Sequence, residues 1–241
     1  MSAQLLMLRH GASEHRLCFA TADAAPAEDF LSAGEKAQLS GFSFAAKREG
    51  FLLGRLAAKR ALGALLQEPE LQRIEIRSGV YGQPLVHHRR AGSIEVTVSH
   101  SRGLAVALAY PAEHPMGIDL ESVAADAAVT IIGELEMSAP ERNWLAATGI
   151  DQATACGVLW TAREALGKSL RVGLNGPLGV LALKDIRSAG EGRWVGRYFN
   201  FPRSQCLSQA SGSRVLSVAL PEAVGLALWP QLPRATGQIP Y

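Results

Sequence analysis

Three carboxylates and one lysine, in two short motifs, are the residues of this chain best suited to chemistry. The first motif, GIDLE, sends Asp119 and Glu121 to the same face if it forms a strand. In the second motif, WTAREALGK, Glu164 and Lys168 lie one turn apart on one stripe if the segment is helical. Three carboxylates and an ammonium group that meet across a cleft would suit Mg²⁺ and a pyrophosphate.

The ion that such a cluster would favour is Mg²⁺, which prefers oxygen ligands and usually takes a few carboxylates together with water and phosphates. Asp119, Glu121 and Glu164 would supply these ligands, and the ion would stabilise an in-line displacement at phosphorus. Lys168 would add a point charge on the same phosphate oxygens. Taken singly, each motif is also typical of an ordinary strand end or a surface helix pair, so the joint pattern carries the hypothesis.

A histidine between two serines, His100, follows an apolar segment and is a candidate for phosphate binding. The alternative is a turn in which Ser99 and Ser101 bond to the backbone. The basic residues of segment 47–60 are open to the same two interpretations, a solvated helix face or a phosphate contact.

A rival motif lies near the start, where Arg9, His10 and Gly11 follow an apolar segment and resemble the signature of histidine phosphatases. In that family the histidine becomes phosphorylated. His10 and His100 are only 90 residues apart, which is too short for the large α/β sheet that the family places between its two histidines. The acidic motifs would also have no role in this alternative.

Composition excludes several classes of protein. Of the 241 residues, 48% are hydrophobic and 19% are charged, which indicates a globular chain rather than a disordered one. The net charge of +2 is too small to indicate nucleic-acid binding. Three scattered cysteines, no basic leader with an apolar run, and no apolar run long enough to span a membrane favour a cytoplasmic protein without a membrane segment.

Both halves of the chain combine helical and extended segments. The first half contains strands at 4–8, 74–77, 94–98 and 104–110, a helix from a Ser32–Glu35 capping box to about Leu39, and a helix at 47–66, and a strand at 116–121 follows. The second contains a helix from a Ser138–Glu141 capping box to about Ala147, a helix from Asp151 to about Leu170, strands near 178–184, 193–200 and 214–220, and an irregular proline-rich tail. Helices grouped apart from strands favour the α+β class. Helices precede strands in each half, which allows an internal duplication although no sequence repeat is visible.

With these motifs placed, the chain resembles a 4′-phosphopantetheinyl transferase of the surfactin-synthetase-activating type from about Leu31 to Leu174. The matching segments, in family order, are FLLGRLAAK at 51–59, GQP at 82–84, VSHS at 98–101, GIDLE at 117–121 and WTAREALGK at 160–168. The resemblance implies an α+β pseudo-dimer of two similar halves with the active site in the cleft between them. We assign coenzyme A binding to residues 1–112, and the metal ligands and catalytic helix to residues 113–241, with the linker near 111–115.

The resemblance also implies the reaction and its residues. The 4′-phosphopantetheine group of coenzyme A would pass to a serine of an apo acyl or peptidyl carrier protein, with release of 3′,5′-ADP. The implied roles are metal ligation by Asp119, Glu121 and Glu164, catalysis by Glu164 and Lys168, and coenzyme A binding by Arg55, Arg77, Ser99, His100 and Lys168. Internal symmetry would make a monomer sufficient, and segment 124–136 with the neighbouring helix is the candidate surface for the carrier.

Two residues depart from the family pattern. Gln83 stands where the family often has lysine, which would remove one cation from the nucleotide pocket. Arg163 replaces the lysine frequently found before the glutamate; it keeps the charge but cannot act as a base. A degenerate homologue that binds coenzyme A or a carrier without transferring anything is therefore a third hypothesis, beside the transferase and the histidine phosphatase.

Overall fold

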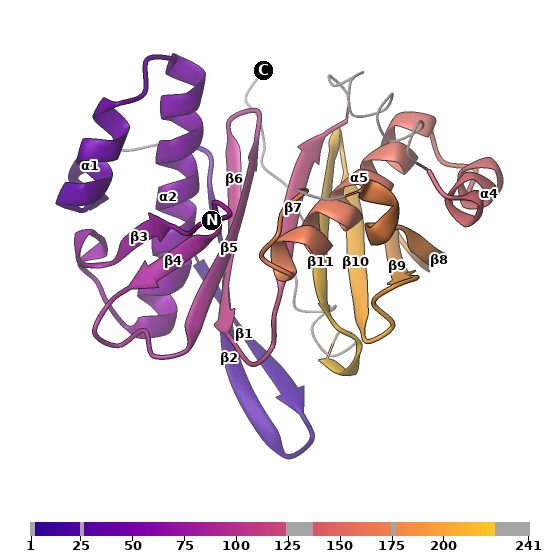
Figure 1. The fold of residues 1–241 in the computed structure, drawn as a ribbon, viewed down its shortest axis with the longest axis horizontal. Coiled ribbons are helices and arrows are strands. Elements are labelled where there is room, and N and C mark those ends of the chain that lie inside the picture. The colour runs from indigo at the N-terminus through magenta and orange to yellow at the C-terminus, as the bar shows by residue number, and fades with distance from the viewer. Residues whose placement is uncertain (1–2, 25–26, 124–136, 175–176, 225–241) are drawn as a thin grey trace. The chain divides into compact units, whose positions relative to one another are not determined.

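A computed structural model of the chain describes residues 3–24, 27–123, 137–174 and 177–224. It divides into two compact units, Met1–Pro115 and Met116–Tyr241. In each unit the described residues form helices that pack against an antiparallel sheet, which confirms the expected α+β class (Figure 1). The candidate carrier segment 124–136 and the tail from 225 lie outside the described residues.

The first unit is built on a four-stranded antiparallel sheet in the order β1-β2-β6-β5, with a separate β3-β4 hairpin. The elements are β1 (Ala3–His10), β2 (Ser13–Ala22), α1 (Ala33–Ser40), α2 (Ala45–Leu66), β3 (Glu75–Ser78), β4 (Pro84–His87), β5 (Ile94–Ser101), β6 (Leu104–Pro111) and two 3-10 turns, Glu28–Phe30 and Leu71–Arg73.

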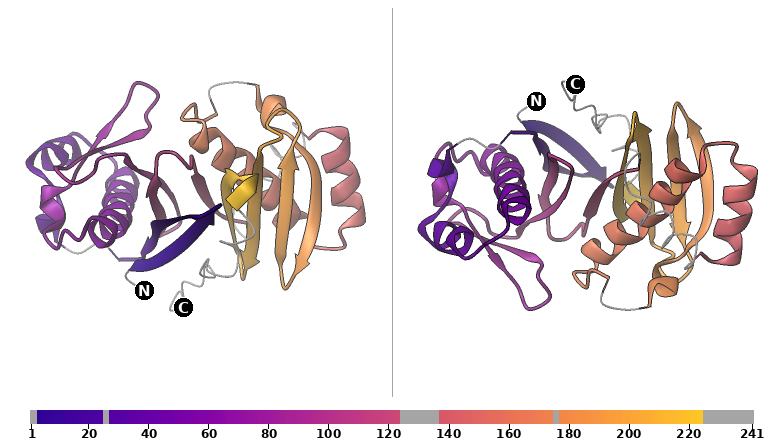
Figure 2. Two further views of the ribbon diagram at one scale, coloured as in Figure 1. Left: turned by 90° about the horizontal axis from the view of Figure 1, so that it is seen from below. Right: turned by 90° about the horizontal axis from the view of Figure 1, so that it is seen from above.

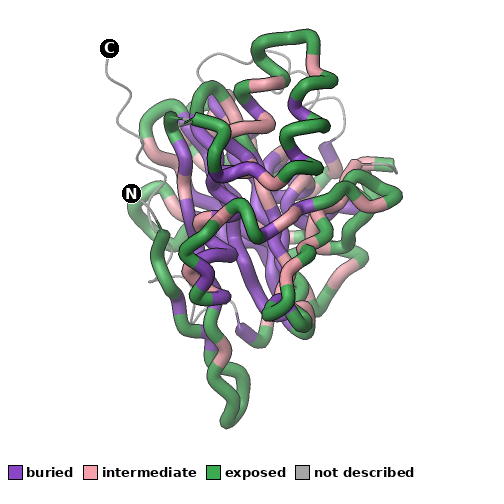
Figure 3. The backbone as a smooth tube through the Cα atoms, turned by 90° about the vertical axis from the view of Figure 1, so that its left-hand side faces the viewer, coloured by how far each residue is buried: buried purple, intermediate pink, exposed green. Residues whose placement is uncertain are grey.

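Helix α2 lies along one face of this sheet, against β2, β5 and β6 (Figure 2). Small residues make the contact close, because Ala57 and Ala61 of the helix and Ala107 of β6 are all fully buried in one core. Many residues of these central elements are buried, whereas those at the tip of the β1–β2 hairpin are mostly exposed (Figure 3). The apolar periodicity of segment 47–66 therefore predicted this helix correctly.

The second unit has a five-stranded antiparallel sheet in the order β7-β11-β10-β9-β8. The elements are β7 (Gly117–Ser122), α4 (Ala139–Ala147), α5 (Gln152–Ser169), a 3-10 turn (Leu178–Leu181), β8 (Leu183–Gly190), β9 (Arg193–Tyr198), β10 (Ser204–Ser211) and β11 (Arg214–Pro221). Helix α5 packs across this sheet, against β7, β11 and β10 (Figure 2). No helix among the described residues is long and apolar enough to cross a membrane.

The sequence predicted where the capped helices begin, but it misplaced or missed some of the strands. Ser32 and Ser138 both form the expected capping boxes, and Asp151 caps α5 through the backbone N–H of Thr154. The strand predicted near 178–184 is wrong, since Leu178–Leu181 is a 3-10 turn and the strand begins only at Leu183. Strands β2, β4 and β10 were missed; β2 and β10 mix polar and apolar residues, so their pattern did not show the strands that backbone pairing with β1 and β9 defines.

Candidate functional site

The two acidic motifs meet where α5 crosses β7, inside the second unit. Helix and strand approach closely here, because a Cβ built on Gly117 would lie 1.9 Å from the carbonyl oxygen of Ala165. Only glycine permits that contact. The last turns of α5, which carry Glu164 and Lys168, are therefore held directly beside Asp119 in the middle of β7.

A direct ion pair joins the two motifs. The Nζ atom of Lys168 lies 2.5 Å from Oδ1 of Asp119 and 3.6 Å from Oε2 of Glu164. Asp119 is buried, with a side-chain exposure of 1%, whereas Lys168 and Glu164 expose 26% and 23%. One lysine thus bridges a buried carboxylate on the strand and a partly exposed carboxylate on the helix.

The electrostatics of this cluster favour a proton or a cation. Burial raises the pKa of Glu164, and the charges of Asp119 and Glu121 raise it further, to about 7. Burial works to lower the pKa of Lys168, but attraction to Asp119 and Glu164 outweighs it and the pKa is raised. The cluster therefore holds a charged lysine beside a carboxyl group that titrates near neutrality, as a general base requires.

The three carboxylates form a charge cluster rather than a closed ligand cage. In the described part of the chain, Asp119, Glu121 and Glu164 are not a group whose ligand oxygens all lie within 4.8 Å of one another. A hard oxygen set of this kind nonetheless fits Mg²⁺, which usually keeps several waters and binds through one or two carboxylates plus phosphates. Burial first, and then the charges of Asp119 and Glu121, raise the pKa of Glu164 despite the neighbouring Lys168.

Buried hydroxyl groups support the strand beneath the cluster. Ser217 of β11 stands opposite Asp119 in the ladder, and its Oγ lies 2.7 Å from both Thr161 Oγ1 of α5 and Ser208 Oγ of β10. These hydroxyls link the helix to two strands and fix their relative position. The sequence did not predict these contacts, although one of the hydroxyls, that of Thr161, lies inside the WTAREALGK motif.

Arg163 does not take part in the acidic cluster. Its guanidinium is buried and contacts Glu141 of α4 at two points, with Nε 3.2 Å from Oε1 and Nη2 2.6 Å from Oε2. Its neighbour Glu164 points to the cluster instead. The departure at position 163 thus falls on a buried structural pair, and a planar guanidinium suits the two-point contact.

The expected nucleotide residues Ser99 and His100 lie at the end of β5 in the first unit. Ser99 is buried and His100 is exposed. The His100 ring packs over Gly50 of α2, where a Cβ would lie 2.8 Å from Cε1 of the ring. The ring is thus held against the start of α2 by a glycine that leaves room for it.

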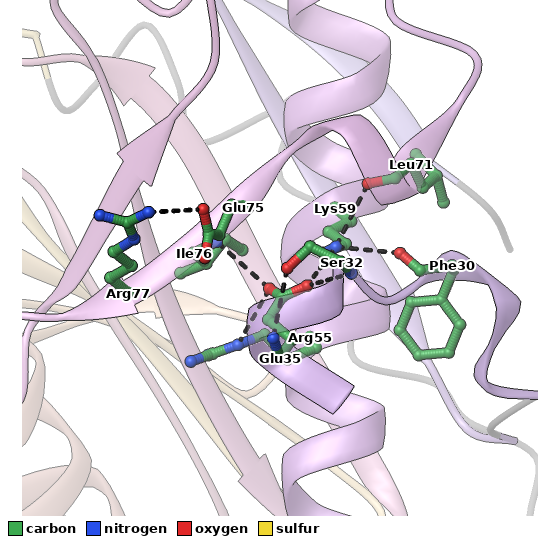
Figure 4. Close-up of polar contacts among 9 residues, drawn as sticks. All are labelled: Phe30, Ser32, Glu35, Arg55, Lys59, Leu71, Glu75, Ile76 and Arg77. Carbon is green, nitrogen blue, oxygen red and sulfur yellow. Dashed lines mark hydrogen bonds and ion pairs between the residues drawn. The ribbon is translucent and has the colours of Figure 1, made fainter. Parts of the chain in front are cut away.

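The two arginines expected to bind coenzyme A already have carboxylate partners (Figure 4). Nε of Arg55 lies 3.4 Å from Oε1 of the buried Glu35, and the guanidinium stacks over the Phe51 ring at 4.7 Å. Arg77 is exposed and pairs with Glu75 at 2.9 Å. Arg77 remains accessible to a phosphate, whereas Arg55 belongs largely to the structural network around Glu35.

Lys59 and Gln83 also have structural contacts. Lys59, one of the basic residues of segment 47–60, is fully buried and donates to the carbonyl oxygens of Phe30 and Leu71 as well as pairing with Glu35. The Gln83 side chain accepts a hydrogen bond from the backbone N–H of Tyr81 and stabilises the turn between β3 and β4. The apolar surroundings of Lys59 in the sequence were the signal for its burial.

Two family models match the chain. The model of the 4′-phosphopantetheinyl transferase superfamily matches residues 115–219, which include the whole acidic cluster. The model of the 4′-phosphopantetheinyl transferase N-terminal domain matches residues 35–110, which include the four candidate residues of the first unit.

A solved structure is also similar to part of the chain. The structure is a holo-(acyl-carrier-protein) synthase from Bacillus anthracis str. Ames in complex with CoA (3′,5′-ADP), which is 21% identical to this chain. The match covers 44% of this chain and 97% of that one, with a TM-score of 0.36. No curated protein matches the chain.

Proposed function

We propose that the chain is a 4′-phosphopantetheinyl transferase, which transfers the 4′-phosphopantetheine group of coenzyme A to a serine of an apo acyl or peptidyl carrier protein; the matches of two models of this family to residues 115–219 and 35–110 support the proposal. The observation that carries this proposal is the contact of Lys168 with Asp119 and Glu164, within the segment that the superfamily model matches. The presence of a matched N-terminal domain in the same chain supports the surfactin-synthetase-activating type.

In the proposed reaction the serine Oγ attacks the β-phosphorus of coenzyme A. A bond forms between Oγ and phosphorus, the bond from phosphorus to the bridging oxygen breaks, and 3′,5′-ADP leaves with that oxygen. Glu164 is our candidate for the base that accepts the hydroxyl proton, since in the absence of a bound ion its pKa is raised to about 7. Lys168, as a cation on the same cluster, would contact the phosphate oxygens and stabilise charge on the leaving group.

We further propose that Asp119, Glu121 and Glu164 hold Mg²⁺. The ion would neutralise the charge of the pyrophosphate. Asp119 is pre-positioned by its place in β7, and Glu164 by its place on α5. In the first unit, Arg77 and His100 are the candidates for the 3′-phosphate and Ser99 for the adenine, while Arg55 would contribute only if it left Glu35.

Intact mass measurement tests the proposal. The protein is incubated with coenzyme A, Mg²⁺ and several apo carrier proteins, and the carriers are then weighed. We expect at least one carrier to gain the phosphopantetheine mass, and Asp119→Asn and Glu164→Gln to slow this transfer by at least about 10²-fold. The matched control is Glu49→Gln, an exposed carboxylate on α2 of the first unit, which should leave the rate unchanged.

The two alternatives predict different results. Binding of coenzyme A without a mass gain on any carrier would indicate the non-catalytic homologue. Metal-independent phosphate release that His10→Ala abolishes would indicate a histidine phosphatase. The fold gives little support to the latter, because every strand pair among the described residues is antiparallel and His10 lies at the exposed end of a hairpin.

A further inference from the structure

A cluster of three histidines and a glutamate lies in the first unit and has no role in the proposed transfer. His10 ends β1, His15 lies in β2, and Glu113 and His114 lie in the turn after β6. The sequence singled out His10 for a phosphatase signature, yet in the structure its ring neighbour is His114, at 5.5 Å between centroids. The cluster therefore needs another explanation.

The side chains of His15, Glu113 and His114 converge. Their ligand atoms all lie within 4.8 Å of one another, and within the described ranges no other group of three histidine, cysteine or carboxylate side chains does so. Nδ1 of His15 is 3.0 Å from Oε1 of Glu113, and the rings of His15 and His114 are edge to face with centroids 4.5 Å apart. Two nitrogen donors and one carboxylate oxygen thus face a common point.

The most buried member of the group has an unsatisfied ring nitrogen. His114 is 6% exposed, and its Nε2 atom is buried without a hydrogen-bond partner among the described residues. Leaving a buried polar atom unpaired is costly, and in native proteins such an atom is explained by strain, by a catalytic role or by a bound water or ion. Burial, together with the nearby His15, lowers the pKa of His114, so its ring is neutral at neutral pH.

The backbone around His114 is fixed. Its N–H donates to the carbonyl oxygen of Pro111 at 2.9 Å, and the N–H of Ala112 donates to Ser93 at 2.7 Å. On the other side, the register of β1 against β2 fixes His15 opposite Leu8. Tetrahedral bonds of about 2.0–2.1 Å require ligand atoms about 3.3 Å apart, and the three ligand atoms already lie within 4.8 Å of one another.

We propose that His15, Glu113 and His114 form a binding site for a divalent transition metal ion, for which Zn²⁺ is the best match, with His10 close enough to serve as a fourth ligand. Imidazole and carboxylate donors suit Zn²⁺ and its neighbours in the first row, whereas Mg²⁺ prefers oxygen ligands alone. The ion would join the β1–β2 hairpin to the turn after β6 and stabilise the first unit. The site is separate from the acidic cluster, and the proposal does not depend on the transferase activity.

Zinc binding by the full chain without an affinity tag tests the site. After treatment with a chelator, the protein is titrated with ZnCl₂ in a calorimeter, and bound zinc is counted after dialysis. We expect one equivalent of bound Zn²⁺, and His15→Gln and His114→Gln should each weaken its affinity by at least about tenfold. The control His87→Gln changes an exposed histidine on β4 and should bind as the unchanged protein does.

A second histidine variant and a measurement of thermal stability separate a loss of zinc binding from a loss of folding. His114→Gln alters a buried residue, so circular dichroism must show that it folds, whereas His15→Gln changes a side chain that is 21% exposed. Zn²⁺ should raise the thermal midpoint of the unchanged protein and of His87→Gln but not of His15→Gln. The proposal fails if the unchanged chain retains no zinc, if both histidine variants bind zinc as tightly as it does, or if only Glu164→Gln loses the ion.

Discussion

The two units of this chain contain the same buried arrangement of a capping box, a cation and a strand, built from different residues. In the first unit, Glu35 accepts from the N–H of Ser32 at 2.9 Å and from the N–H of Ile76 at 3.2 Å. Its carboxylate also pairs with Lys59, which is fully buried on α2. One glutamate thus connects the start of α1, the long helix and strand β3 (Figure 4).

The second unit repeats each of these contacts. Glu141 accepts from the N–H of Ser138 at 2.7 Å and from the N–H of Leu183 at 3.0 Å, and it pairs with the buried Arg163 of α5. It connects the start of α4, the long helix and strand β8. Since a Ser-x-x-Glu box, a helical cation and a strand N–H recur in the same order, the structure supports the internal duplication that the element order allowed.

The units differ at the residues that follow the buried cation. After Lys59 comes Arg60, whose guanidinium donates to the carbonyl oxygen of Thr21. After Arg163 comes Glu164, whose carboxylate lies 3.6 Å from Lys168 and belongs to the acidic cluster. The shared glutamate and cation therefore belong to the scaffold, whereas the residue that follows the cation is part of the candidate site in the second unit.

The largest effect should follow removal of either shared glutamate. Glu35→Ala and Glu141→Ala each leave a buried cation without its carboxylate, and we expect each to lower the free energy of unfolding by about 3–5 kcal/mol. Denaturant unfolding measures the loss, and amide exchange shows in which unit protection falls. The control is Glu49→Ala, an exposed residue on α2 that should change stability by less than about 0.5 kcal/mol. A large loss for one variant and none for the other would show that the two networks are not equivalent.

A smaller effect, present in the second unit only, should follow the titration of Glu164. Because its pKa is raised to about 7, the folded state holds this proton more tightly than the unfolded state does. The resulting stability is complete below the ordinary pKa of a glutamate and is lost as the pH rises through about 7. Glu164→Gln has no such loss, so without Mg²⁺ it should gain roughly 1–3 kcal/mol over the unchanged protein between pH 5 and pH 8.

Unfolding curves at several pH values between 5 and 8 measure this difference. The control in the first unit is Arg60→Gln, at the equivalent position after the buried cation, where an arginine does not titrate in this range. Its stability relative to the unchanged protein should not vary with pH. Parallel pH profiles for Glu164→Gln and the unchanged protein would contradict the raised pKa of Glu164.

The sequence predicted what is local in the fold and in the candidate site. Capping boxes and the 3.6-residue period depend on neighbours within one or two turns, so all four helices were found, and the capped helices α1, α4 and α5 were found with their starts. The pairing of Glu164 with Lys168 follows from their i, i+4 spacing in the same way. Asp119 is distant from both residues in the sequence, so its position beside them was predicted from the joint occurrence of the two motifs and not from local spacing.

What the sequence did not reveal depends on distant contacts. Arg55 was assigned to the nucleotide pocket, but Glu35, 20 positions earlier, engages it. Arg163 was noted only as a departure from the family pattern, and its pairing with Glu141 was not predicted. The His15 cluster was missed for the same reason, since its members come from β2 and from the turn that follows β6. Long cationic side chains are bound by whichever carboxylate the fold brings near, and no local pattern reports that partner.

The smallest of the expected losses of stability should follow removal of the serine caps at the starts of α1 and α4. Ser32 and Ser138 accept hydrogen bonds from the N–H groups of Glu35 and Glu141 at 3.3 and 3.5 Å, which are long for such bonds. We expect Ser32→Ala and Ser138→Ala each to lower the free energy of unfolding by about 1 kcal/mol, since the alanine leaves one helical N–H without its cap. Denaturant unfolding checks both values. Equal losses would show that the caps are interchangeable scaffold in the two units, whereas a loss above about 3 kcal/mol at either serine would show that the cap also holds the buried glutamate in place.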